Sequence, residues 1–272
     1  MESEFALYLL TAVLYGVLAV HFWRTRWAGT AAPWSRARER LALLAPLALH
    51  TLLLYRSAFA GEGLHLGVAN AVSMIIWLTV LIYWTGSFFY SLDGLQALIL
   101  PVAAAAALLP ALLPAPAPLP NTELPAFRVH LLIALLSYSL FTIASLHVLL
   151  MAVVERRLHG GALPSALGKL PPLLAMEGLL FRIIGAGFVL LTLTLASGVF
   201  FSEELFGRPL QFTHKTVFGI LSWLIFGALL GGRALYGWRG RVAVRWTLAG
   251  FLMLVLAYIG SKFVLEVILG RA

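Results

Sequence analysis

Three of the seven histidines in this chain stand at the ends of apolar segments. They are His65, His130 and His214, and each lies at the same expected end of a different hydrophobic run. Ionisable side chains in such segments usually face a bundle interior or a cavity, and they are candidates for function. Neutral imidazole is a ligand for zinc, copper, nickel and iron. Their placement therefore predicts a metal or metal-cofactor site at one end of the molecule.

The groups near these imidazoles favour haem over a bare metal ion. The chain has no cysteine, and Glu203 and Glu204 are the only acids close to His214. Zinc and nickel sites commonly add thiolate or carboxylate ligands, whereas haem iron takes axial histidines and its porphyrin needs an apolar slot. We therefore predict non-covalently bound haem b, with His130 and His214 as axial ligands of the iron. His65 is expected to be an alternate ligand or a supporting group.

Two cations adjoin the predicted ligands. Arg128 precedes His130 by two residues, and Lys215 follows His214 directly. Cationic side chains pair strongly with carboxylates, so both are predicted to meet the haem propionates. An alternative stays open for each histidine taken alone, because an imidazole at a helix end can also be an interfacial group bonded to water or to a neighbour.

The other histidines are expected to have structural roles. His50 and His147 are predicted to form hydrogen bonds between helices, and His21 is predicted to anchor the first helix at the membrane interface. Below His130, a stripe at helical spacing is expected to face the bundle interior. Its members are Ser137, Phe141 and Ser145.

The segments that carry these residues are those of a membrane protein. Of 272 residues, 61% are hydrophobic and 11% are charged, against about 45 to 50% apolar residues in soluble domains. A membrane-spanning helix needs about 20 apolar residues. The sequence therefore predicts an all-α integral membrane protein, one membrane domain over residues 1–272, with about eight spanning helices. The expected spans are 5–23, 41–58, 66–89, 94–113, 128–154, 177–201, 212–232 and 244–268.

The basic residues predict the orientation of the chain. Thirteen of the 19 Lys and Arg residues fall in the connections after the first, fifth and seventh spans, which are therefore expected to be cytoplasmic. Both termini are then expected on the outer side. The same rule accounts for the net charge of +8, so we expect membrane lipid and no nucleic acid as a partner. The run 5–23 is expected to be a retained span, because acidic residues precede it where a signal peptide carries basic ones.

Three segments carry the pattern of a known family. The stretch "GEGLHLGVANAVSMIIWLTV" at 61–80 holds His65 with Asn70 five residues later, and "HLLIALLSYSLFTIASLHVLL" at 130–150 begins with a histidine. The stretch "LQFTHKTVFGILSWLIFGALLGGR" at 210–233 matches in position and length a tryptophan-rich loop and the helix that follows it. Over residues 61–270 the chain resembles the cytochrome c assembly proteins of the CcsA and CcmC type. It is most similar to the HemX/YpjD-like branch.

The resemblance implies a location in the inner membrane and haem held at the outer face. It also implies partners among the cytochrome c maturation proteins. The pattern departs from the family at residues 211–213, which replace the tryptophans and aspartate of the family's WWD motif, and at Ser261 and Lys262, which stand where a second external histidine would be. His214 then supplies the outer ligand from a new position.

Two other functions remain open. One is a membrane scaffold that controls a haem-synthesis enzyme through its basic cytoplasmic loops, chiefly residues 155–176, as the HemX branch suggests. The other is a small-molecule transporter, which the lack of an internal repeat and of paired broken helices disfavours. No enzymatic activity and no catalytic residue are expected, since the spans hold no pairing of nucleophile and base.

Overall fold

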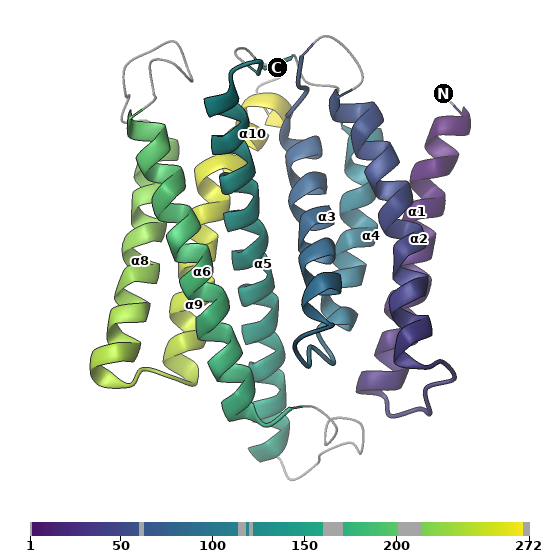
Figure 1. Ribbon diagram of the computed structural model, residues 1–272, viewed down its shortest axis with the longest axis vertical. Helices are drawn as coiled ribbons and strands as arrows, with labels where there is room; N and C mark the ends of the chain where they lie inside the picture. Colours follow the sequence, from purple (N-terminus) through teal and green to yellow (C-terminus); the bar gives the residue numbers. More distant parts are fainter. Residues whose placement is uncertain are drawn as a thin grey trace.

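Long helices lie side by side along the long axis of the molecule (Figure 1). The computed structural model describes residues 2–59, 63–113, 118–119, 122–159, 171–200 and 214–268. The helices are α1 (Glu2–Phe22) with η1 (Trp23–Trp27), α2 (Arg36–Leu54) with η2 (Tyr55–Phe59), α3 (Val68–Gly86), α4 (Gln96–Leu112), α5 (Pro125–His159), α6 (Leu173–Phe200), α8 (His214–Tyr236) and α9 (Arg241–Val255). The C-terminal run consists of η4 (Leu256–Gly260), α10 (Ser261–Phe263) and η5 (Val264–Ile268).

Seven of the described helices are long and apolar enough to cross a membrane, and α4 is a shorter apolar helix of 17 residues. At 1.5 Å per residue, α4 measures about 26 Å, less than the roughly 30 Å of a bilayer core. Pro101 and Pro110 lie within it, and neighbouring helices make such prolines tolerable. The predicted all-helical membrane bundle is confirmed, with the fourth expected span as its short member.

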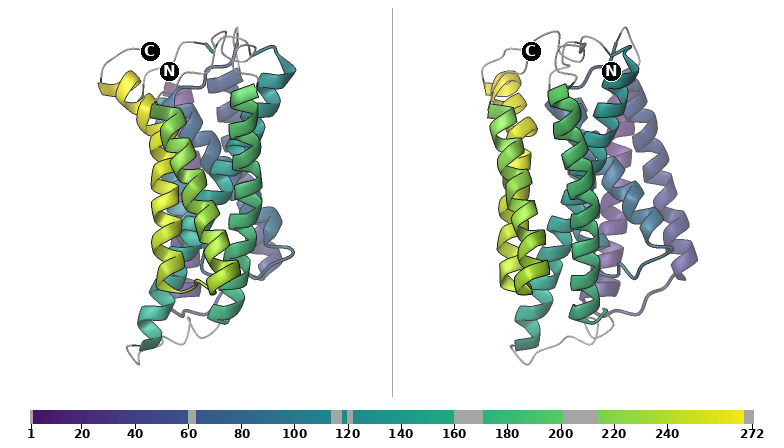
Figure 2. Two further views of the ribbon diagram at one scale, coloured as in Figure 1. Left: turned by 90° about the vertical axis from the view of Figure 1, so that its left-hand side faces the viewer. Right: turned by 60° about the vertical axis from the view of Figure 1, so that its left-hand side comes forward.

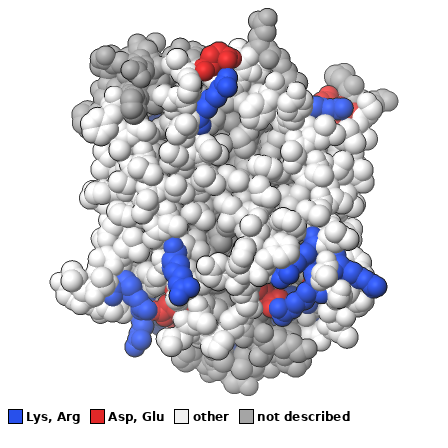
Figure 3. All heavy atoms as spheres, viewed as in Figure 1, with Lys and Arg blue, Asp and Glu red and all other residues white. Residues whose placement is uncertain are grey.

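Apolar side chains cover the outside of the bundle at mid-height. Val17 on α1 and Val189 on α6 are both 58% exposed, and Leu224 on α8 is 50% exposed. Figure 3 shows Lys, Arg, Asp and Glu gathered toward the two ends, with a white belt between them. Such a belt is stable only in contact with lipid, because in water it would be a very large exposed apolar surface.

The helices form two groups that meet at α3 and α5. In the first group α1 packs against α2 and α4, and α3 packs against α4; in the second, α5 and α8 both pack against α6 and α9. The two views of Figure 2 show α8 and α9 side by side along their length. In the most hydrophobic 18-residue stretch of α3, 61% is buried inside the protein, against 11% in that of the C-terminal span. Helix α3 is therefore enclosed by protein, and the last span mostly faces lipid.

An aromatic pair fills the middle of the second group. The rings of Phe141 on α5 and Phe226 on α8 stack with centroids 3.8 Å apart, and both residues are fully buried. Two glycines make room for them. A Cβ on Gly187 would lie 3.1 Å from the Phe141 ring, and one on Gly250 would lie 2.8 Å from the Phe226 ring. The approach of α9 to the aromatic pair therefore leaves no room for a Cβ at Gly250, and the approach of α6 leaves little room at Gly187.

The stripe predicted below His130 does face the interior. Ser137, Phe141 and Ser145 are buried, with exposures of 1%, 0% and 3%. The two interior histidines also join helices, as predicted. The ring of His50 on α2 bonds to Ser73 on α3 and to Tyr15 on α1, and Nε2 of His147 on α5 bonds to a backbone oxygen of α6 at 3.0 Å.

The two ends of the bundle differ in content. Both chain ends lie at one end (Figure 1), here named the terminal end, where α1, α3, α5 and α8 begin. The opposite end, here named the basic end, holds the connections 28–35, 87–95 and 237–240. The arginines there include Arg24, Arg26, Arg36, Arg38, Arg40, Arg239, Arg241 and Arg245. The location of both termini at one end agrees with an even number of spanning elements. The assignment of the basic end to the cytoplasm stays a prediction.

Adding one methyl group at Gly250 should destabilise the protein. In Gly250→Ala the new Cβ collides with the Phe226 ring, which the stack against Phe141 prevents from moving freely. Overpacking of this kind costs about 1 to 3 kcal/mol, so the midpoint of thermal unfolding in detergent should fall. The matched control is Gly185→Ala on α6, where a Cβ meets nothing within 4 Å. That variant should unfold at the wild-type temperature or slightly above it, and equal midpoints for both variants would show that the close packing is not needed.

Candidate functional site

The three histidines singled out in the sequence lie at the terminal end on three separate elements. His65 stands in the connection before α3, His130 in the second turn of α5, and His214 at the first residue of α8. His65 and His130 are partly buried, and His214 is exposed. Helices α5 and α8, which carry His130 and His214, both pack against α6. The structure thus brings the three imidazoles to one end and separates them laterally across α3, α5, α6 and α8.

The ring of His130 is held in one orientation by α6. Its Nδ1 lies 2.7 Å from Oγ of Ser197, and that hydroxyl donates to the backbone oxygen of Thr194 at 3.1 Å. A hydroxyl has one hydrogen to donate, so Ser197 accepts from His130 when it donates to Thr194. In the tautomer with the proton on Nδ1, Nε2 is the basic nitrogen of the neutral ring, which is the form that binds metals. The histidine and serine together make an oriented imidazole ligand.

Lys215 lies among the residues of the C-terminal run. Its Nζ is 5.7 Å from the centroid of the Tyr258 ring, a distance at which the ring attracts the cation. Lys262 and Glu266 act on it electrostatically, and they form an i,i+4 pair with Nζ and Oε1 3.0 Å apart. Two ammonium groups against one carboxylate leave a net positive charge here, so the cluster suits an anionic group.

The same C-terminal run is tied to the start of α3. Oε2 of Glu266 accepts the backbone N–H of Val68 at 2.7 Å, and the Tyr258 hydroxyl donates to the backbone oxygen of Leu66 at 3.3 Å. Val68 opens α3, where backbone N–H groups have no partner within the helix, and a carboxylate is favourable at this end of a helix dipole. Glu266 therefore serves as the cap of α3, from 198 residues further along the chain.

The connection that carries His65 is fixed through Asn70. Nδ2 of Asn70 donates to the backbone oxygen of His65 at 2.7 Å and to that of Ser57 at 3.1 Å. The backbone N–H of His65 donates to Ala58 at 2.9 Å. The spacing of His65 and Asn70 seen in the sequence thus has a structural reason, because the amide holds the histidine's backbone against the end of η2.

Arg128 bonds to residues just before it in the chain. Its Nη2 lies 2.9 Å from Glu123 and its Nε donates to the backbone oxygen of Thr122 at 2.9 Å, with the side chain 64% exposed. Lys215 therefore lies with the C-terminal run, whereas Arg128 lies at the exposed edge of the terminal end. Residues 201–213, which include Glu203 and Glu204 and the positions of the family's WWD motif, lie outside the described residues, as do residues 160–170.

Sequence reasoning missed two contacts at this end, that of Ser197 with His130 and that of Glu266 with α3. Ser197 resembles any serine near the end of a membrane helix, and only the fold brings it to His130. Glu266 and Lys262 did carry a signal, because their i,i+4 spacing predicts an ion pair, but nothing in that spacing points to α3. Within the described residues, no three His, Asp or Glu side chains gather into a metal site of their own.

Comparison with known proteins identifies the family. Residues 34–269 match the model of the family described as Cytochrome C assembly protein. The chain belongs to the cytochrome c assembly family. The resemblance drawn from the histidine-bearing segments is therefore confirmed, and the match covers most of the bundle.

Individual relatives are similar over part of their length. The inner membrane protein YpjD of Escherichia coli K12 is 38% identical over 144 residues, which are 53% of this chain and 54% of that protein. An uncharacterized 28.8 kDa protein of Azospirillum brasilense is 35% identical over 57% of this chain and 58% of its own length. The cytochrome c biogenesis protein CcsA of Prochlorococcus marinus NATL1A is 34% identical over 31% of this chain and 27% of its own. The chain thus spans about half the length of the first two relatives and less of the third.

Removing the carboxylate of Glu266 should loosen the terminal end. In Glu266→Ala the Val68 amide loses its acceptor and Lys262 loses its ion pair, and loss of a helix cap costs about 0.5 to 2 kcal/mol. Thermal unfolding in detergent should begin at a lower temperature, and the Val68 amide should exchange its hydrogen faster.

The matched control is Glu123→Ala, which removes a carboxylate that is 84% exposed at the same end. It should leave both measurements at the wild-type values. Unchanged exchange at Val68 in Glu266→Ala would contradict the assigned cap.

Proposed function

We propose that this protein binds haem b at its terminal end and takes part in cytochrome c-type biogenesis in the inner membrane. The family match supports haem handling, and the names of two relatives refer to cytochrome c biogenesis and to the inner membrane. The observation that carries the proposal is the His130 ring at the terminal end, which the Ser197 hydroxyl on α6 holds in a fixed orientation. Oriented imidazoles of this kind are the usual protein ligands of haem iron.

The residues present fit the chemistry of haem. His130 would bind the iron from α5 and His214 from the start of α8, with His65 as an alternate ligand. Bound haem would supply a redox-active iron, with the imidazoles as its protein ligands. The protein's own contribution is binding and orientation, because histidines, cations and apolar walls are the groups it brings to this end.

Lys215 is the proposed partner of a haem propionate. The cluster of Lys215, Lys262 and Glu266 carries two positive charges against one negative charge, so a second carboxylate would complete it. Arg128 lies nearer the rim and would meet the other propionate only by exchanging its contact with the exposed Glu123. Lys215 is therefore expected to contribute more to haem affinity than Arg128.

The proposed orientation places haem on the outer side. The basic end would face the cytoplasm under the positive-inside rule, and the terminal end would face the compartment where cytochrome c receives its haem. Other maturation proteins would then meet this protein at the terminal end.

Loss of either proposed ligand should abolish the low-spin haem spectrum. Purified protein loaded with haem is expected to give the absorption bands of a bis-histidine haem in the reduced state. His130→Ala and His214→Ala should each convert it to a high-spin spectrum or to haem-free protein. The control is His21→Ala, because His21 lies at the basic end and bonds to Glu39 at 3.0 Å; it should keep the wild-type spectrum.

A protein that stays haem-free, or spectra indifferent to both substitutions, would support the alternative of a membrane scaffold. In that case a haem-synthesis enzyme should co-purify with the full chain and be lost when residues 155–176 are replaced by a neutral linker.

Ser197→Ala should weaken haem binding without removing a ligand. The hydroxyl holds the His130 ring, and loss of a hydrogen-bond partner of a metal-binding histidine typically lowers metal affinity by about 10- to 100-fold. Titration of the protein with haem measures this change. Ser261→Ala is the matched control at the same end, because among the described residues its hydroxyl bonds to backbone oxygens of its own helical run. Equal haem affinities in the two variants would remove Ser197 from the site.

A further inference from the structure

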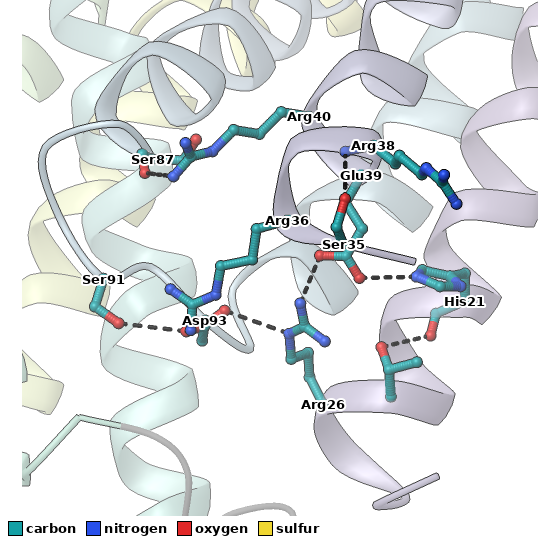
Figure 4. Close-up of polar contacts among 11 residues, drawn as sticks. His21, Arg26, Ser35, Arg36, Arg38, Glu39, Arg40, Ser87, Ser91 and Asp93 are labelled. Atoms are coloured by element: carbon teal, nitrogen blue, oxygen red, sulfur yellow. Dashed lines mark hydrogen bonds and ion pairs between the residues drawn. The ribbon is translucent and has the colours of Figure 1, made fainter. Parts of the chain in front are cut away.

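A pocket opens at the basic end, at the opposite end of the bundle from His65, His130 and His214. It lies between η1, the first turns of α2 and the 87–95 connection, and Figure 4 shows the polar side chains around it. The charged and amide groups that line it are Arg26, Arg36, Glu39, Arg40, Asp93 and Gln96. Three arginines against two carboxylates give the lining a net positive charge.

Both carboxylates of the pocket are already neutralised by protein. Glu39 receives His21 at 3.0 Å on Oε1 and Arg26 at 2.6 Å on Oε2. Asp93 receives Arg26 at 3.3 Å on Oδ1 and Arg36 at 3.0 Å on Oδ2. Arg26 is 15% exposed and lies between the two acids. This network fixes the floor of the pocket, and it leaves one excess positive charge in the lining, on the side of Arg40.

Arg36 and Arg40 keep most of their donors for another partner. A guanidinium has five N–H donors. Within the described part of the chain, Arg40 uses one on the backbone oxygen of Ser87 at 2.5 Å and lies 4.4 Å from the Phe88 ring centroid. Arg36 uses one on Asp93 and is 70% exposed. Because the two arginines are one helical turn apart on α2, they border the same opening and suit a phosphate group.

Gln96 lies in the wall of the pocket and is 5% exposed. Its side chain interacts with Tyr83, and its Oε1 is enclosed by the protein. Gln96 therefore belongs to the structural wall of the pocket, and the groups that face an incoming anion are Arg36 and Arg40.

The surface beside the pocket is suited to the lipid interface. Phe88, Phe89 and Tyr90 follow α3 and are 51%, 77% and 47% exposed. Aromatic residues are enriched at the level of the lipid head groups. These three therefore place the opening of the pocket at that level, where a lipid phosphate can reach Arg36 and Arg40.

We propose that this pocket binds the head group of an anionic phospholipid such as phosphatidylglycerol. Arg36 and Arg40 contact the phosphate. Basic pockets between spanning helices are typical sites for anionic head groups. The site is separate from the proposed haem site, and neither depends on the other.

The test is lipid binding by the full-length protein, measured by native mass spectrometry with phosphatidylglycerol and with zwitterionic phosphatidylcholine. The wild type should retain phosphatidylglycerol in preference. The double variant Arg36→Gln/Arg40→Gln should lose about tenfold or more in that preference. The matched control is Arg24→Gln/Arg38→Gln, which removes two charges at the same end from exposed positions that do not line the pocket; Figure 4 shows Arg38 directed away from Asp93 and Ser87. It should keep the wild-type preference.

Two further measurements in the lipid-binding experiment distinguish the possible outcomes. Arg36→Gln alone removes an exposed side chain and should fold normally with an intermediate loss, which guards against a folding defect in the double variant. Inorganic phosphate should not displace the lipid at millimolar concentration, and displacement without a lipid preference would assign the pocket to a soluble anion instead. Equal losses in both double variants would show that overall surface charge attracts the lipid, and either result overturns the proposed site.

Discussion

Hydrocarbon offers no hydrogen-bond partner, and this constraint determines where polar groups occur in the bundle. Within the spans, threonine hydroxyls such as those of Thr51 and Thr142 bond to their own helix, while Ser137 and Ser222 donate to backbone oxygens of a neighbouring helix. Interior histidines also bond across helices, as His50 does. Ion pairs with several partners gather at the two ends, where the chain leaves the apolar layer. The interior is therefore held together mainly by close packing, as where glycines lie against the stacked phenylalanines. The charged groups that can bind ligands lie at the two ends.

The two ends are organised by carboxylates that join distant segments. At the basic end Glu39 and Asp93 hold η1, α2 and the 87–95 connection around Arg26. At the terminal end Glu266 joins the C-terminal run to the start of α3. Each of these three acids has more than one partner. In each of the two clusters around them the cations outnumber the acids, so positive charge remains that can bind other anions. Both proposed sites follow from this imbalance, one for haem propionates and one for a lipid phosphate.

Hydropathy and helical spacing were enough to predict the helices, the buried face of α5 and the common level of the three histidines. These features depend on local pattern, as does the family resemblance, which rests on short segments around His65 and His130. The contacts of Ser197 and Glu266 were not predictable, because the residues they join are 67 and 198 positions apart. The short length of α4 was also not predicted, because its apolar composition resembles that of a full span. The haem ligands themselves remain proposals.

The cap on α3 has a consequence for biosynthesis. Val68 leaves the ribosome long before Glu266, so α3 must enter the membrane with its first amides uncapped. The carboxylate arrives only with the final stretch of the chain, after α5, α6 and α8 have been made. The contact between the C-terminal run and α3 can therefore form only after the last helix has been translated. A chain interrupted before residue 266 would have its bundle helices without that contact.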